Sequence, residues 1–314
     1  MRTNRQLTTV LLLAAFAAVG CSKPFDDPET KAQQPPPLSM AKPIAVANAA
    51  SPKDEEGTTG DVPTKSGGPV SFANADAAYQ AKNYSEAARL FEQYSERRPN
   101  NAWGHFMLGL SAWKAGDLAT AEGGFEEALK IDPNHVKSLV NLSRVLIDQH
   151  RFDEALVRLT HAGEVDPTSV DVQRLLGRVY AAEHKTDQAV TAYRRAIALD
   201  ARDAWSMNNL GLLFLEQNQA EEALPLLCRA VQLRTDVAAF HNNLGMALEH
   251  TGRFLAAAEE YRGALTADPG YGKAKQNLAR VEAVKTGPEE PFDLEAIAKR
   301  SEEAPSADQT TAVR

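Results

Sequence analysis

The sequence is poor in cysteine, in aromatic residues and in the short motifs that mark enzyme active sites. Only two cysteines occur, Cys21 and Cys228, so a disulfide-rich fold is excluded. No HExxH, GxSxG or CxxC motif and no phosphate-binding glycine loop is present, and the seven histidines are scattered. We therefore predict no catalytic residue, no metal site and no cofactor, and we interpret Cys228 as a small helix residue.

An excess of basic residues is also missing. The chain has 34 Lys and Arg against 42 Asp and Glu, which gives a formal net charge of −8. An acidic chain of this kind is not suited to binding nucleic acid or an anionic membrane surface through charge. The sequence predicts no nucleic-acid partner and no small-molecule substrate.

Near the N-terminus, no apolar run reaches the roughly 20 residues that a membrane-spanning helix needs. The longest run there, residues 10–19, follows Arg2 and Arg5 and is typical of a signal peptide over residues 1–20. Residues 18–21, Ala-Val-Gly-Cys, resemble a bacterial lipobox, which implies cleavage before Cys21 and acylation of that cysteine. Because Ser22 is not acidic, we expect a lipid anchor in the outer membrane, facing the periplasm. The alternative is an ordinary secretory signal that happens to contain a cysteine.

Two further segments lack hydrophobic periodicity. Residues 21–67 are rich in Pro, Ala, Ser, Thr and Gly and predict a disordered tether, which as a flexible coil spans roughly 40 Å. Residues 286–314 predict a disordered tail. Within it, Phe292, Leu294 and Ile297 leave two interpretations open, a short amphipathic docking motif or a frayed end.

Between these segments the sequence repeats itself every 34 residues, in units that begin at 68, 102, 136, 170, 204 and 238. Place 8 of each unit is small: Ala75, Gly109, Ser143, Gly177, Gly211 and Gly245. Place 20 is alanine: Ala87, Ala121, Ala155, Ala189, Ala223 and Ala257. Place 24 is large and apolar: Phe91, Phe125, Leu159, Tyr193, Leu227 and Tyr261.

This pattern resembles the tetratricopeptide repeat (TPR). The resemblance implies an all-α, right-handed superhelical solenoid of six helix-turn-helix units with a capping helix at 272–285, so that the repeat domain covers residues 68–285. Small residues at places 8 and 20 let neighbouring helices approach to roughly 8–10 Å.

Places 2, 5, 9 and 12 share one face of each first helix, and in tetratricopeptide proteins that face lines a concave groove, with place 6 beside it. Asparagines gather there: Asn141, Asn208, Asn209, Asn242, Asn243 and Asn277. An amide both donates and accepts hydrogen bonds, so a column of amides can bind the main chain of an extended peptide. The repeats of O-linked N-acetylglucosamine transferases carry a similar asparagine ladder. The alternative is that these asparagines bond helix ends within the repeat stack.

The remainder of the predicted groove is uneven. Aromatic residues cluster at its first end and return in unit five: Phe72, Tyr79, Trp103, Phe106, Trp113 and Trp205. The middle is basic: Lys137, Arg144, Arg174 and Arg178. The alternatives are a tether that folds back over the aromatic end and a solvated charged face in the middle.

We predict a lipid-anchored envelope scaffold, not an enzyme, that binds an extended protein segment during assembly of a pilus or secretion machine. Lipobox, tether and repeats together resemble the assembly lipoproteins of tight-adherence (Flp) and type IV pili. The alternative is an adaptor that targets an enzyme acting on peptidoglycan or another glycan. Glu260 is expected on an outer helix face, away from the groove.

Overall fold

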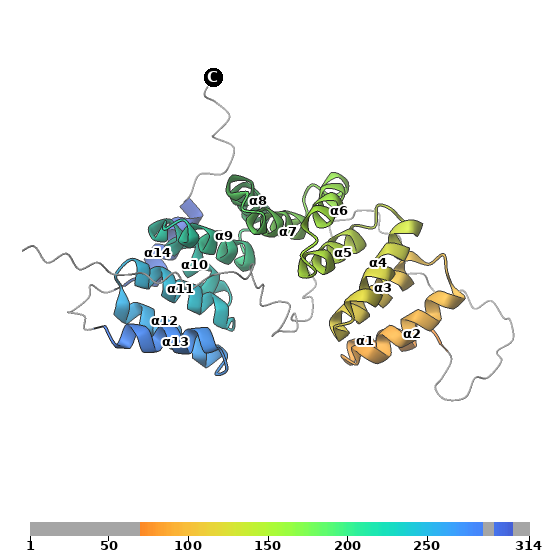
Figure 1. Ribbon diagram of the computed structural model, residues 1–314, viewed down its shortest axis with the longest axis horizontal. Helices are drawn as coiled ribbons and strands as arrows, with labels where there is room; N and C mark the ends of the chain where they lie inside the picture. The colour runs from red at the N-terminus through yellow and green to blue at the C-terminus, as the bar shows by residue number, and fades with distance from the viewer. Residues whose placement is uncertain (1–69, 285–291, 304–314) are drawn as a thin grey trace, which may run out of the picture. The chain divides into compact units, whose positions relative to one another are not determined.

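The computed structural model describes residues 70–284 and 292–303 of the 314-residue chain (Figure 1). These residues form fourteen α-helices, with no strand among them. Cys21, the predicted signal peptide and the predicted tether lie outside the described residues. None of the helices in the described ranges is long and apolar enough to cross a membrane.

The helices follow the repeat frame in antiparallel pairs. The first helices of the pairs, followed by the cap helix, are α1 (Phe72–Gln80), α3 (Ala102–Ala115), α5 (Val136–Asp148), α7 (Val170–Ala182), α9 (Ala204–Glu216), α11 (Ala238–His250) and α13 (Gly272–Glu282). The second helices are α2 (Tyr84–Arg97), α4 (Leu118–Ile131), α6 (Phe152–Val165), α8 (Thr186–Leu199), α10 (Ala220–Leu233) and α12 (Phe254–Ala267). The first helices of units two to six therefore start at the first residue of their repeats. This all-helical stack of consecutive pairs is the predicted fold class.

The repeated residues form the core of the stack. The alanine at place 20 and the large residue at place 24 are completely buried in all six units. Place 8 lies under the side chain at place 24: a Cβ added to Gly177 would sit 2.5 Å from the ring of Tyr193. The 34-residue pattern is therefore a packing pattern.

The turn inside each pair uses a left-handed backbone at place 15 of every unit. Positive φ angles, between 57° and 87°, occur there at Lys82, Gly116, His150, His184, Asn218 and Gly252. Only Gly adopts this conformation without steric cost. His150 and His184 are thus turn residues that terminate a helix, and their 34-residue separation follows from the repeat frame.

Consecutive first helices contact one another across repeats, from α3 through α5, α7, α9 and α11 to α13. No pair of consecutive second helices makes comparable contact among the described residues. The first helices thus form an inner row. We call the surface made by places 2, 5, 6, 9 and 12 of this row the first-helix face.

The predicted disordered tail is wrong over residues 294–303, which form a fourteenth helix, α14 (Leu294–Glu303). This helix packs against α10 (Figure 1). Its Ala298 is buried, and Phe292, Leu294 and Ile297 pack against the same core cluster as Cys228. The structure therefore shows that Phe292, Leu294 and Ile297 form a docking motif and not a frayed end. The motif docks on α10 of the same chain.

The reason that α14 docks on α10 lies at place 25 of the repeat, which faces away from the stack. This place is polar in five units: Glu92, Glu126, Thr160, Arg194 and Arg262. In unit five it is Cys228, which is fully buried. An apolar residue at a place that is otherwise polar was the sequence signal for a helix docked on α10. Burial raises the pKa of the Cys228 thiol to about 12, so the thiol stays protonated.

Replacing Ile297 with Asp should release α14 and expose Cys228. The change removes the burial of one Ile side chain, which weakens docking by about 2 kcal/mol, so local opening becomes at least about tenfold more frequent. The measurement is the rate of maleimide labelling in a chain carrying Cys21→Ser, where Cys228 is the sole thiol. Lys299→Gln, at an exposed position of the same helix, is the control. Equal labelling rates in the two variants would refute the docking role of Ile297.

Candidate functional site

Five of the six predicted asparagines form one hydrogen-bonded chain across α9, α11 and α13. Asn277 Nδ2 donates to Asn242 Oδ1 at 2.9 Å, and Asn243 Nδ2 donates to Asn208 Oδ1 at 2.9 Å. Within each pair, Asn242 donates to Asn243 at 3.4 Å and Asn208 donates to Asn209 at 3.2 Å. We call this series the asparagine chain. It bonds first helix to first helix, whereas the alternative interpretation placed the bonds at helix ends.

The asparagine chain is largely buried. Asn208 and Asn242 are 3% and 2% exposed, while Asn209 and Asn243 retain 8% and 9%. Buried amides lose their bonds to water, so their mutual bonds offset a desolvation cost. The double asparagine of units five and six therefore supports the stack, whatever else it binds.

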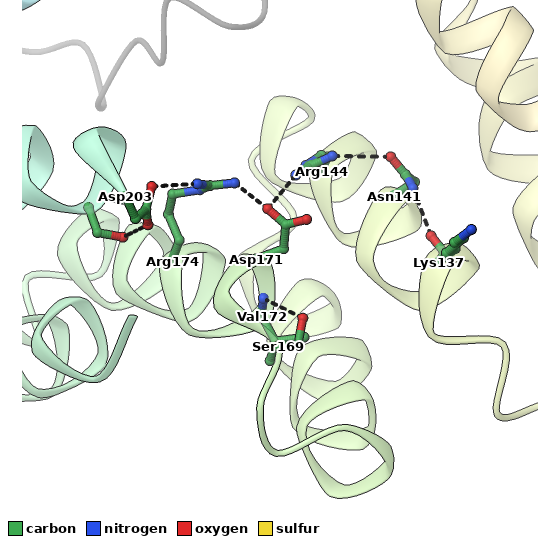
Figure 2. Close-up of polar contacts among 9 residues, drawn as sticks. Lys137, Asn141, Arg144, Ser169, Asp171, Val172, Arg174 and Asp203 are labelled. Atoms are coloured by element: carbon green, nitrogen blue, oxygen red, sulfur yellow. Dashed lines mark hydrogen bonds and ion pairs between the residues drawn. The ribbon is translucent and has the colours of Figure 1, made fainter. Parts of the chain in front are cut away.

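A second polar series, which we call the charged chain, joins α5, α7 and α9 (Figure 2). Arg144 donates to Asn141 Oδ1 at 3.3 Å and to Asp171 Oδ1 at 3.2 Å. Arg174 pairs with Asp171 and donates to Asp203 Oδ1 at 2.8 Å. Asp203 in turn accepts a hydrogen bond from the hydroxyl of Ser206 on α9. Asn141 Nδ2 is bonded to the Lys137 carbonyl oxygen at 2.8 Å.

The charged chain shows that two arginines of the predicted basic middle are paired with carboxylates. Arg144 and Arg174 face two carboxylates from the same row of helices, so their charges are compensated. Partial burial opposes ionisation of Asp171, but Arg144 and Arg174 outweigh it and hold the pKa of this carboxyl below its usual value. Arg178 is 6% exposed. A solvated charged face is therefore wrong for these arginines, and Lys137 is the exposed member of the group.

The aromatic end combines buried and accessible rings. Phe106 is buried, with its ring 5.9 Å from that of Phe125. Trp103 and Trp113 are half-buried on α3, and each carries a lysine ammonium over its ring, Lys137 at 4.8 Å and Lys114 at 4.6 Å. Such stacking holds a cation beside an accessible apolar surface.

The other predicted aromatics take part in packing. Phe72 lies edge-on to Phe91 at 5.3 Å, and Tyr79 lies 5.4 Å from Tyr84. Trp205 is buried against Phe240 at 4.8 Å. Phe106 and Trp205 are thus not available on the first-helix face, whereas Phe72, Tyr79, Trp103 and Trp113 are half-buried there.

Sequence reasoning missed a buried ion pair in unit six. Glu260 is 8% exposed, so the expectation of an outer-face position is wrong. Its carboxylate lies 2.7 Å from His241 Nδ1, and His241 Nε2 lies 3.1 Å from the Thr235 carbonyl oxygen. A carboxylate and a carbonyl oxygen both accept, so these neighbours favour the imidazolium form, in which both ring nitrogens carry protons. Burial disfavours that charge, but Glu260 and Thr235 outweigh it and raise the pKa of His241.

This pair should make stability depend on pH. Because the folded pKa of His241 is raised, the stabilisation is fully present below the unfolded pKa of about 6.5 and is lost as pH rises through the folded pKa. Between the two values, each pH unit removes about 1.4 kcal/mol. The measurement is the free energy of unfolding from pH 5 to pH 9, compared between the native chain and His241→Asn. A constant difference between the two over this range would contradict the assignment.

The described residues contain no group of three His, Cys, Asp or Glu side chains that could hold a metal ion. The arrangement on the first-helix face is one of accessible rings, compensated charges and amides. Groups of this kind can make apolar contacts and hydrogen bonds to a ligand.

Two family models match the chain. Residues 70–211 match a tetratricopeptide repeat-like domain, and residues 208–272 match a tetratricopeptide repeat. No curated protein matches this sequence.

Several solved structures are similar in fold. The Cut9–Hcn1 hetero-tetramer of the APC/C is 18% identical with a TM-score of 0.61, over 67% of this chain and 41% of that chain. The pilF protein of Pseudomonas aeruginosa is 19% identical with a TM-score of 0.57, over 66% and 95%. The TPR protein TTC0263 of Thermus thermophilus is 20% identical with a TM-score of 0.51, over 59% and 100%.

The two family matches together extend over residues 70–272, more than half of the 314 residues, and the chain belongs to the tetratricopeptide repeat family.

Proposed function

We propose that this protein-interaction scaffold binds an extended protein segment along its first-helix face. The observation that supports this most directly is the pair of half-buried tryptophans on α3, Trp103 and Trp113, each with a lysine ammonium over its ring. Tryptophan is enriched among the residues that contribute most to protein–protein binding, so partly accessible tryptophans on a helical scaffold support a binding role. The rings suit apolar side chains of the segment, and the lysines suit acidic ones.

The proposal includes a place in the cell. The lipobox-like residues 18–21 support acylation of Cys21 and attachment to the bacterial envelope, with the outer membrane facing the periplasm as the expected side. The order of lipobox, tether and repeats resembles the assembly lipoproteins of tight-adherence and type IV pili. On that architectural ground we propose a role in assembling a pilus or secretion machine.

Site-specific photo-crosslinking in the living cell tests the binding face. Probes replace Leu110 on α3, between the two tryptophans in sequence, and Leu212 on α9, three residues after Asn209. Both positions are half-buried at place 9 of their repeats. The control probe replaces Glu259, which is exposed on α12.

We expect both first-helix probes to capture the same protein and the control probe to capture none. A pilus or secretion component would support the assembly role, whereas a peptidoglycan-acting or glycan-acting enzyme would favour the adaptor function instead. Capture from Glu259 as strong as from Leu110 and Leu212 would refute the first-helix face as the binding site.

A further inference from the structure

The direction of the asparagine chain is set at its far end by a group that can only donate. The oxygen and nitrogen of an amide are distinguished by the bonds that they make. Arg280 Nη1 donates to Asn277 Oδ1 at 2.9 Å, and a guanidinium cannot accept a hydrogen bond. The amide of Asn277 must therefore turn its oxygen to Arg280 and its nitrogen to Asn242.

Arg280 is itself held in place by the core. Glu249 accepts from Arg280 Nε at 2.8 Å and from Nη2 at 2.7 Å, a two-point contact that fixes the guanidinium plane. The hydroxyl of Tyr261, a fully buried residue at place 24, donates to the same carboxylate at 2.8 Å. The Arg280 side chain is 55% exposed, and these contacts link it through Glu249 to a buried tyrosine.

Each amide then orients the next one. Asn242 accepts from Asn277, so its nitrogen faces Asn243 Oδ1; Asn243 in turn donates to Asn208. Asn208 therefore donates to Asn209 Oδ1. At the end of the series Asn209 has its oxygen engaged, and no described residue bonds its Nδ2. Asn209 is 8% exposed, and its Nδ2 bonds no acceptor within the described part of the chain.

We infer that the asparagine chain holds the Asn209 amide with its NH₂ group presented as a hydrogen-bond donor. This donor binds a main-chain carbonyl oxygen of the bound segment. Arg280 is the positioning residue for the Asn209 amide. The inference deepens the proposed function and rests on it for the identity of the ligand as a peptide.

The surroundings favour a neutral acceptor over a carboxylate. Arg144 and Arg174, on the two preceding first helices, are compensated by Asp171 and Asp203, so the neighbouring part of the face offers no uncompensated pair of arginines to an anion. The equivalent amide in unit three differs in one respect. Asn141 Nδ2 already donates one of its two N–H groups to the Lys137 carbonyl oxygen of its own helix, whereas Asn209 keeps both.

The first test needs no partner. The full chain is labelled with ¹⁵N-asparagine, and the side-chain amide signals are compared for Arg280→Met, Arg280→Lys and Arg262→Met. Arg262 pairs with Glu282 at 2.6 Å and bonds no asparagine of the described ranges, so it is the matched control. We expect Arg280→Met to shift the amide signals from Asn277 through to Asn209. Arg280→Lys should largely restore them because it keeps a donor, and Arg262→Met should leave them unchanged.

A change confined to Asn277 would show that orientation is not transmitted, and it would overturn the positioning role of Arg280. Equal shifts in the Arg262→Met chain would overturn it as well.

The second test combines Asn209→Asp with the Leu212 probe. The carboxylate that this substitution introduces keeps an acceptor for Asn208 and removes the donor, so we expect capture to fall about tenfold or more. Asn134→Asp, at an exposed position between α4 and α5 outside the first-helix face, should leave capture unchanged. Unreduced capture with Asn209→Asp, in a chain whose thermal midpoint is unaltered, would overturn the donor role.

The two failures are distinguishable. Absence of capture from Leu212 in the otherwise native chain would refute the proposed function and leave the amide signals to decide the orientation of the asparagine chain. Capture that survives Asn209→Asp would refute the inference and leave the scaffold function standing.

Discussion

Gly124→Ala should destabilise the protein by about 3 kcal/mol, the upper end of what overpacking usually costs. A Cβ at this position would lie 2.6 Å from the backbone nitrogen and 2.8 Å from the Cα of Gly109, and 3.0 Å from the His105 carbonyl oxygen. These are main-chain atoms of α3, which cannot rotate away as a side chain would. The whole of α3 or α4 would have to move.

The adjacent glycine is a matched control. A Cβ at Gly123 would meet nothing within 4 Å, so Gly123→Ala should stabilise α4 by up to about 1 kcal/mol through its better helix propensity. Urea unfolding of both variants measures the difference. If the two substitutions changed the free energy of unfolding by similar amounts, the close crossing of α3 and α4 would not be present.

Asp203→Ala should also cost about 3 kcal/mol, because breaking a buried ion pair leaves a charge without compensation. The Asp203 side chain is 2% exposed, and its partner Arg174 is 12% exposed. The substitution also removes the acceptor for the buried hydroxyl of Ser206. Arg174 keeps Asp171, which places the expected loss at the lower end of the range for buried pairs.

Comparison with Asp171→Ala isolates the effect of burial on the strength of the ion pair. Asp171 also pairs with Arg174, but its side chain is 47% exposed, so its loss should cost less than about 1 kcal/mol. The measurement is the free energy of unfolding of both variants under one set of conditions. A larger loss for Asp171→Ala than for Asp203→Ala would refute the view that burial decides the strength of this network.

The repeat fold was predictable because its determinants recur. Place 8, place 20 and place 24 each appear six times, and sterics at the Gly177–Tyr193 contact explain why place 8 must be small. The helix α14 was not predicted, because its determinant occurs once. Cys228 at place 25 looked like an ordinary small residue, and its meaning depends on a docking partner some 66 to 70 positions away along the chain.

The candidate site was predictable as a face but not as a set of bonds. Helical spacing brought the asparagines and arginines together on first helices, yet it could not show that Asp171 and Asp203 compensate Arg144 and Arg174. These two aspartates lie at places 2 and 34 of unit four, close in the repeat frame to the predicted basic residues. That closeness was the sequence signal that could have revealed the pairing. Glu260 was misplaced because a charged residue on a second helix is usually solvated.

The two polar chains have a consequence for the modularity of the array. Apolar packing in a shared 34-residue frame would by itself let one repeat be deleted, duplicated or exchanged, since every unit offers the same small and large residues to its neighbours. The charged chain is directional and differs from one interface to the next, whereas the asparagine chain makes the same bond, from place 6 to place 5 of the preceding unit, at the α9–α11 and α11–α13 interfaces. Removing residues 170–203 would keep the frame but bring α5 against α9 without Asp171, Arg174 and Asp203. From α5 to α9 the array is therefore periodic in its packing but aperiodic in its bonding, and its units there cannot be permuted.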